Sequence, residues 1–306
     1  MNHTTLQLGI VLGWSLCVAL FAWYAASVAR EITYVTLADG RKTERKIPLL
    51  IRLLLPFVGN FSRLVASKSF DKARGEAEWM LIAGGMEGLL NANEFLAMKF
   101  LMPIVCGGVW TLMMFALAAL MPGSVFAENI LPLSAMGVFW FYIYPISWLR
   151  RTLKQRHLAI MKALPFVLDL LTLSVEAGMD FMSALQRNCE RRKLDALNEE
   201  LIRMTKEIQV GTPRRTALRN MADRVRQSDL KSVAFALIQA DELGVSIGSI
   251  LRIQSEQLRS RRFDRAEKLA NEAPVKMLGP LMLCIFPAVF VILLGPILMQ
   301  ASKSAF

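Results

Sequence analysis

The sequence is poor in the residues that bind metals. Its 306 residues include two histidines and four cysteines, and no two cysteines form a CxxC pair. The cysteines are Cys17, Cys106, Cys189 and Cys284. A structural zinc site needs four ligands at short spacings, and a disulfide framework needs paired cysteines in an oxidising compartment. We therefore expect no metal site, no cofactor and no disulfide framework.

Motifs for nucleotide binding and metal-dependent catalysis are also missing. The sequence contains no GxxxxGK[ST] loop for phosphates and no HExxH pair for zinc. Its long apolar stretches hold no Asp or Glu, whereas a transporter or proton channel carries ionisable residues inside its spans. We predict that the protein is not an enzyme. The alternative is a polytopic membrane enzyme or transporter with no recognisable catalytic or ion-binding motif.

Four stretches of 20 to 23 residues contain no charged residue. They are Leu8–Ala29, Phe100–Met121, Ile130–Leu149 and Met277–Met299. Twenty helical residues extend about 30 Å, which matches the hydrocarbon core of a bilayer. A soluble helix needs a polar face and seldom stays uncharged over this length. The sequence predicts an all-α integral membrane protein with about four transmembrane helices.

The basic residues lie on one side of the predicted membrane. Of the 36 Lys and Arg residues, 11 lie in residues 30–99 and 24 in residues 150–276. Loops rich in Lys and Arg stay in the cytoplasm, so both segments are predicted to be cytoplasmic and both termini outside. Basic residues beside anionic lipid account for the net charge of +11. We expect no nucleic-acid partner, because no nucleic-acid-binding signature is present.

The first apolar stretch has a second interpretation. Ser27-Val28-Ala29 before Arg30 looks like a signal-peptidase site, and cleavage there would leave three spans with the same downstream orientation. Residues 1–7 carry no basic residue, and the stretch is long for the apolar region of a signal peptide. Both features favour an uncleaved span.

The spans divide the chain into five parts. These are an N-terminal transmembrane helix (1–29), a first cytoplasmic helical segment (30–99), a transmembrane hairpin (100–149), a cytoplasmic helical bundle (150–276), and a C-terminal transmembrane helix with a short outer tail (277–306). Ile47–Val65 is apolar but interrupted by Pro and Arg. It either lies in the membrane interface or packs on the neighbouring domain. Ala73–Leu90 is predicted to be a short helix pair around Gly84-Gly85.

Three glycines are predicted to end helices in the cytoplasmic bundle. They are Gly178, Gly211 and Gly244, and glycine adopts the left-handed conformation at a helix end without strain. Polar residues are expected to cap the helices that follow: Asp180, Thr212 with Pro213 at the first helical position, and Ser228. The last helix, from Ser246, is expected to be interrupted or bent near Pro274.

Successive glycines are 33 residues apart. Each glycine is followed by an apolar pair, and the spacing from glycine to pair is the same all three times. The pairs are Ala184-Leu185, Ala217-Leu218 and Ile250-Leu251. Ankyrin and tetratricopeptide repeats have a similar period. Two periods are too few for a stable solenoid, so a compact helical bundle is the better interpretation.

This ordered set resembles the F-domain family of type II secretion and type IV pilus inner-membrane platform proteins, from about Leu164 to the C-terminus. The runs that carry the resemblance are Leu164-Pro165, Glu176-Ala177-Gly178, Glu207-Ile208-Gln209-Val210-Gly211 and Asp241-Glu242-Leu243-Gly244, each with its apolar pair. Asp241 departs from the pattern, where the family often has glycine. A backbone role for that position therefore does not carry over.

The C-terminal part resembles one branch of the family. It contains Arg259-Ser260-Arg261-Arg262-Phe263, Val275-Lys276-Met277, Gly279-Pro280-Leu281 and Phe286-Pro287. These runs, and a single F domain, look like the TadB/TadC branch, which serves tight-adherence (Flp) pili. The short tail and the Val-Lys-Met run favour a TadC-like protein.

The resemblance implies a non-enzymatic platform subunit in the bacterial inner membrane. Such proteins bind a cytoplasmic, secretion-type hexameric ATPase and help to lift pilin subunits out of the membrane. The expected partners are that ATPase, a paralogous F-domain platform protein, pilin subunits, membrane lipid, and further copies in a homo- or hetero-oligomer. Prolines in the spans would let them bend, or are ordinary membrane-helix prolines.

Four acidic residues lie just before the glycines: Glu176, Glu207, Asp241 and Glu242. One interpretation is an acidic contact surface for the ATPase or a platform partner. The other is that these carboxylates bind caps or basic neighbours inside the bundle. An acid near a helix C-terminus opposes the helix dipole, so another interaction is expected to retain it. We predict them as candidate partner contacts, and the three glycines as structural helix stops.

Overall fold

The computed structural model describes residues 34–36, 42–44, 47–48, 50–55, 58, 61, 70–120 and 129–304. These residues are helical apart from turns and one short antiparallel hairpin, in which β1 (Tyr34–Thr36) pairs with β2 (Lys42–Glu44). The prediction of an all-α fold is confirmed. The sequence does not predict the hairpin, because three-residue strands are too short to show alternation.

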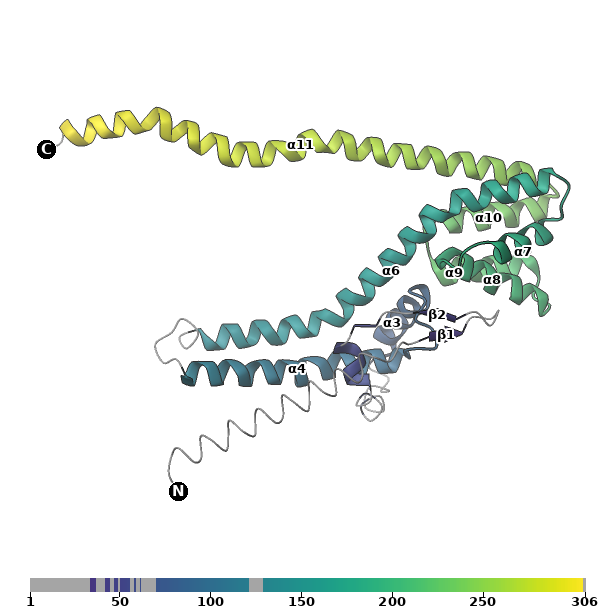
Figure 1. Ribbon diagram of the computed structural model, residues 1–306, viewed down its shortest axis with the longest axis horizontal. Helices are drawn as coiled ribbons and strands as arrows, with labels where there is room; N and C mark the ends of the chain where they lie inside the picture. The colour runs from purple at the N-terminus through teal and green to yellow at the C-terminus, as the bar shows by residue number, and fades with distance from the viewer. Residues whose placement is uncertain are drawn as a thin grey trace, which may run out of the picture.

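Two long arms extend from a helical bundle in the same general direction (Figure 1). One arm is a hairpin of α4 (Ala92–Leu120) and α6 (Ile130–Glu176), and the other is α11 (Ile247–Ser304). These three described helices are long and apolar enough to cross a membrane. They carry the second, third and fourth predicted spans. The first predicted span, Leu8–Ala29, lies outside the described residues.

The α4–α6 hairpin is closely packed. A Cβ atom on Gly137 of α6 would collide with the indole ring of Trp110 in α4. The indole nitrogen of Trp110 donates a hydrogen bond to the carbonyl oxygen of Leu133, at 3.2 Å. The absence of a side chain at Gly137 therefore leaves room for the indole ring. Small residues commonly allow such close packing between membrane helices.

A single helix, α3 (Asp71–Ala83), precedes α4. The prediction of a helix pair around Gly84-Gly85 is therefore wrong. Residues 84–90 form turns instead, because Gly85 and Gly88 adopt positive φ angles of 70° and 82°, which cannot continue a right-handed helix.

The apolar segment between residues 47 and 65 contributes to a small second core. Ile51, Leu54 and Val58 are buried there against side chains of α3 and α4, including Leu81 and Met98. Of the two interpretations of this segment, the structure favours packing on the neighbouring helices.

The bundle consists of four short helices, the C-terminal half of α6 and the N-terminal half of α11. The short helices are α7 (Phe181–Arg191), α8 (Ala196–Gln209), α9 (Arg214–Val225) and α10 (Ser228–Leu243). Their apolar faces share one core, with Leu185, Leu218 and Leu251 from the repeated pairs almost completely buried. One shared core makes this a compact bundle rather than a solenoid.

Short loops make successive helices run in opposite directions. The ends of α6, α8 and α10 and the starts of α7, α9 and α11 therefore gather at one end of the bundle. This end, which we call the distal tip, lies opposite to the direction in which the two arms extend (Figure 1).

Two predicted caps are wrong, and a third has the predicted geometry. Asp180 accepts hydrogen bonds from the backbone amides of Met182 and Ser183. Thr212 does not cap α9, because Pro213 has extended ψ and itself precedes the first helical residue. Ser228 is the first residue of α10, and the longer Gln227 side chain caps it by accepting from the Leu230 amide at 2.5 Å.

The long helix α11 continues through Pro274, so the expected interruption there is absent. A proline removes one backbone hydrogen bond, and this bends rather than ends a long helix whose other residues favour the helical state. In the part of α11 after Leu258, no residue with described burial is classed as buried. This exposed region includes residues 277–296 of the apolar span.

Candidate functional site

The distal tip is built from three equivalent helix ends. Gly178, Gly211 and Gly244 follow α6, α8 and α10 with φ angles of 88°, 105° and 67°. After each glycine, the next amide returns to the carbonyl five residues earlier: Met179 to Ser174, Thr212 to Glu207 and Val245 to Ala240, each at 3.0 Å. This is the Schellman ending, which satisfies carbonyls that the helix leaves unpaired.

The structure brings the four predicted acidic residues to this end of the bundle, and each lies beside an arginine. Glu176 in α6 is 3.1 Å from Arg252 in α11, and Glu207 in α8 is 2.8 Å from Arg224 in α9. Asp241 and Glu242 in α10 lie 2.7 and 4.0 Å from Arg215 at the start of α9.

At the distal tip, these ion pairs join α10 to the start of α9 and α6 to the start of α11. The Glu207–Arg224 pair lies further from the tip, because Arg224 is in the last turn of α9. Asp241 also pairs with Arg214 at 2.9 Å, and that guanidinium stacks over the ring of Phe181 at the start of α7. The hydrogen bond from Arg215 and the charge of Arg214 keep the pKa of Asp241 below its usual value. Glu242 is the acidic residue of this set with the most exposed side chain, at 49%. Its carboxylate is therefore the most accessible of the four to a partner protein.

Apolar side chains stand exposed among these charged pairs. Val210 is 87% exposed and Leu243 77%, and Val245 beside them in sequence is also exposed. An apolar residue directly before a glycine stop recurs in the 33-residue period, as Ala177, Val210 and Leu243. This repetition was visible in the sequence. Its exposure was not, because the same spacing is also typical of a core position.

A groove of 620 Å³ runs between α6 and α7 close to the distal tip. Phe166, Leu170 and Leu173 of α6 are exposed along it, at the spacing of one helix face. Arg187 and Arg191 of α7 line its other side. The groove and the exposed apolar residues of the tip together offer a mixed apolar and basic surface.

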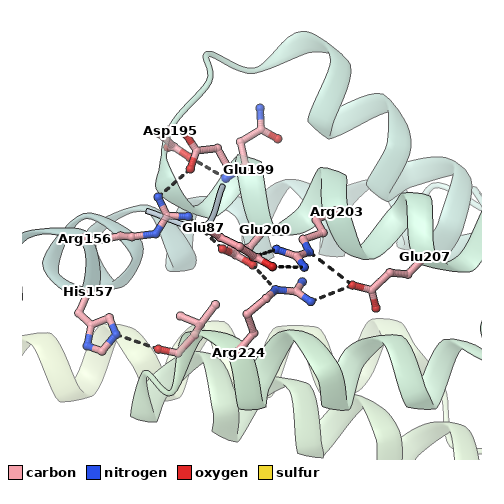
Figure 2. Close-up of polar contacts among 11 residues, drawn as sticks. Glu87, Arg156, His157, Asp195, Glu199, Glu200, Arg203, Glu207 and Arg224 are labelled. Carbon is pink, nitrogen blue, oxygen red and sulfur yellow. Dashed lines mark hydrogen bonds and ion pairs between the residues drawn. The ribbon is translucent and has the colours of Figure 1, made fainter. Parts of the chain in front are cut away.

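A line of alternating charges fixes α6 within the bundle (Figure 2). The buried Arg156 of α6 donates to Glu199 at 2.7 Å and to Glu200 at 2.9 Å, both in α8. Glu200 also accepts from Arg224 of α9 at 2.9 Å. Buried carboxylates and guanidiniums persist when each has its partner, so these residues specify how α6, α8 and α9 meet.

The same line of charges reaches the segment that precedes α4. Arg203 of α8 lies near Glu207 and forms an ion pair with Glu87, in the turns before α4. The hydrogen bond from Arg203 holds the pKa of Glu87 below its usual value. Arg226, at the end of α9, stacks over Trp79 of α3 at 4.9 Å. Both contacts dock the α3–α4 region against the bundle.

Within the part of the chain that the structure describes, no group of three His, Cys, Asp or Glu residues has the geometry of a metal site. The bundle also contains a GxSxG run, Gly244-Val245-Ser246-Ile247-Gly248. In hydrolases this motif follows a strand and presents its serine on a sharp turn. Here it connects the helices α10 and α11, so the context of a nucleophile is missing.

Comparison with known families gives one match, which covers most of the bundle. Residues 167–295 match the family described as type II secretion system (T2SS), protein F. The match begins in the C-terminal part of α6, covers α7 to α10 and ends within the apolar part of α11. The resemblance seen in the sequence is confirmed at this level. No curated protein and no solved structure matched the chain.

The protein F domain contains the features described above. All three glycine stops, the four paired acidic residues and the α6–α7 groove lie in it, except for Phe166 at its edge. Glu87 and Arg156 lie outside the matched range, so the line of charges joins the protein F domain to the preceding part of the chain. Residues 167–295 are therefore similar to T2SS protein F, and three described helices are long and apolar enough to cross a membrane.

Proposed function

We propose that the protein is an inner-membrane platform subunit of a type IV (Tad/Flp) pilus assembly system or a type II secretion-like machine. In this role it couples a cytoplasmic hexameric ATPase to pilin extraction and fibre assembly, and it performs no catalysis itself. The observation that carries the proposal is a T2SS protein F domain that is continuous with membrane-spanning helices at both of its ends.

The geometry supports mechanical coupling. The 47-residue helix α6 extends from the predicted membrane to the distal tip, about 70 Å at about 1.5 Å per residue. From the tip, α11 returns to the membrane as one 58-residue helix. Force applied at the tip would therefore reach two spans through unbroken helices, one of them fixed in the bundle by Arg156.

The orientation that this role needs places both arms in the inner membrane, the bundle in the cytoplasm and both termini outside. The distribution of Lys and Arg supports it. Reporter fusions that fluoresce only in the cytoplasm and alkaline phosphatase fusions that are active only outside would test it at residues 90, 125 and 306.

The distal tip is the proposed ATPase contact. It is the part of the bundle farthest from the predicted membrane, and it combines exposed Val210 and Leu243 with the half-exposed carboxylate of Glu242. A paralogous platform protein and pilin subunits would bind elsewhere, along the arms.

The test is crosslinking and affinity purification of the tagged protein from native membranes, followed by mass spectrometry. We expect a secretion-type ATPase and a second F-domain protein, with a photo-crosslinker at position 243 capturing the ATPase and one at exposed position 158 not doing so. Recovery of neither protein would contradict the platform role.

Charge reversal by Glu242→Arg tests the contact face separately. We expect it to reduce ATPase recovery severalfold while the variant keeps its melting temperature. The matched control is Glu190→Arg, an exposed residue on α7. If the two variants recover equal amounts of ATPase, the acidic contact is wrong, whereas the platform role stands on the pull-down of the unchanged protein.

A further inference from the structure

A second pocket lies at the opposite end of the bundle, next to the predicted membrane. It has a volume of 450 Å³ and opens between α6 and the turn that joins α9 to α10. The α6 side contributes Arg150, Lys154 and His157, and the turn contributes Arg226 and Ser228. None of the described residues that line it is acidic.

The positive charges of this pocket are not matched by the chain's own carboxylates. Arg150 and Lys154 are one helical turn apart on the same face, both are exposed, and neither has an ion-pair partner among the described residues. Arg226 has a positive φ of 53°, unusual for a residue other than glycine. Its guanidinium stacks over the ring of Trp79 at 4.9 Å, and Arg226 itself lines the pocket.

The carboxylate that directly follows the pocket-lining turn in sequence is already neutralised. Asp229 follows Ser228 and is buried, with Arg261 at 3.2 Å and Arg265 at 3.0 Å. Arg265 also contacts Met161, which lines the pocket, at 2.6 Å. α11 therefore adds positive charge at the edge of the pocket, and the pocket keeps a net positive charge.

The depth of the pocket matches the phosphate layer of a bilayer. The uncharged part of α6 ends at Leu149, and Arg150 follows directly. His157 lies seven residues further, about 10 Å along the helix axis at about 1.5 Å per residue. Lipid headgroups occupy a layer of roughly this depth beyond the hydrocarbon core. The start of α10 at Ser228 adds the positive end of a helix dipole.

We propose that this pocket binds the phosphate of an anionic phospholipid headgroup in the leaflet facing the bundle. Arg150 and Lys154 bind the phosphate oxygens by charge, and Arg226 approaches from the opposite side. A lipid bound there links α6 to the α9–α10 turn and fixes the orientation of the bundle relative to the membrane surface. This inference needs α6 to cross a membrane but does not depend on the platform role.

Native mass spectrometry of the purified full chain tests the proposal. The protein is exchanged into micelles with phosphatidylglycerol or with phosphatidylcholine at equal amounts, and the bound lipids are counted. We expect phosphatidylglycerol to be retained at least fivefold more than phosphatidylcholine, and Arg150→Gln with Lys154→Gln to remove most of this preference. Equal retention of the two lipids by the unchanged protein would overturn the proposal.

Two further variants control for charge and folding. Arg187→Gln with Arg191→Gln removes the same charge at the same spacing from α7, far from the pocket, and should leave retention unchanged. Arg150→Lys with Lys154→Arg keeps the charges and should keep the preference for phosphatidylglycerol. If the α7 variant loses as much lipid as the α6 variant, the binding is not specific to this pocket and the proposal is wrong.

Free phosphate is the other source of the same chemistry. Inorganic phosphate at 10 mM is added to the protein that holds phosphatidylglycerol. We expect the lipid to stay bound, because its acyl chains remain in the micelle. If phosphate displaces the lipid from the unchanged protein, and binds less to the Arg150→Gln, Lys154→Gln variant, the pocket is a soluble-anion site and the lipid proposal fails.

Discussion

The guanidinium of Arg156 and the carboxylate of Glu200 lie 2.9 Å apart, buried between α6 and α8 (Figure 2). The pair joins the helix that leaves the membrane to the body of the bundle. Arg156 stands outside the matched T2SS protein F range, and Glu200 stands within it. Their contact therefore binds the protein F domain to the preceding helix with more specificity than apolar packing alone would give.

Arg156→Met is expected to destabilise the bundle by about 3 kcal/mol, because breaking a buried ion pair leaves Glu199 and Glu200 with too little compensating charge. Thermal and denaturant unfolding in detergent, followed by tryptophan fluorescence, would measure the loss. The control is Arg151→Met, since Arg151 is exposed on the same helix. Equal stability of the two variants would show that the buried pair contributes little.

Gly211→Ala is expected to destabilise the protein by about 1–2 kcal/mol. The cost comes from the φ angle of 105°, since a Cβ atom at this position meets nothing within 4 Å. Gly75→Ala in α3 also meets open space, but it lies inside a helix, so we expect it to be neutral or stabilising by up to about 1 kcal/mol. Melting temperatures that change in the same direction for both would contradict this.

Gly137→Ala should loosen the α4–α6 hairpin. The added methyl group meets the indole ring of Trp110, and overpacking of this kind costs about 1–3 kcal/mol. Gly108→Ala, in the same hairpin, adds a methyl group that meets nothing within 4 Å. We expect limited proteolysis in detergent to cut the first variant sooner than the second. A similar rate for both would mean that the indole moves aside freely.

Acid should weaken the contact between α10 and α11 through Asp229. Burial would raise the pKa of this carboxyl, but Arg265, Arg261 and Gln227 outweigh burial and hold it below the ordinary value of 3.8. A lowered pKa in the folded state means that the stabilisation is present above about pH 3.8 and is lost as the pH falls through the folded value. Melting temperatures from pH 6 to pH 3 should fall less steeply for Asp229→Asn, and identical slopes would exclude Asp229 as the cause.

The spans and the helix order of the bundle could be predicted because each rests on local signals. An uncharged stretch such as Ile130–Leu149 predicts a span, and a glycine such as Gly244 after an apolar period predicts a helix end. Both signals lie within one continuous segment of the sequence. The caps at Thr212 and Ser228 were mispredicted because preference for a residue type is weaker than the local backbone geometry. In the structure, Pro213 and Gln227 are the N-cap residues of α9 and α10.

The contacts between distant residues could not be predicted from one sequence. Nothing near Glu207 indicates that Arg224 will face it across a helix pair, and nothing near Arg150 places the α9–α10 turn beside it. The role of the four acidic residues as partner contacts stays a prediction, and their arginine partners depend on how the helices pack. Neither the tip with its exposed Val210 nor the membrane-side pocket follows from periodicity alone.

The buried pairs of Arg156 also have a consequence for biosynthesis. Glu199 and Glu200 follow Arg156 by 43 and 44 residues, so a ribosome adding about 5–20 residues per second completes them roughly 2–9 s later. During this interval α6 has no carboxylate for its arginine. In the proposed orientation, the arginine would then be one more positive charge behind a newly inserted span, and would favour retention of this end of the helix in the cytoplasm. The same side chain would serve first in membrane insertion and afterwards in the folded core.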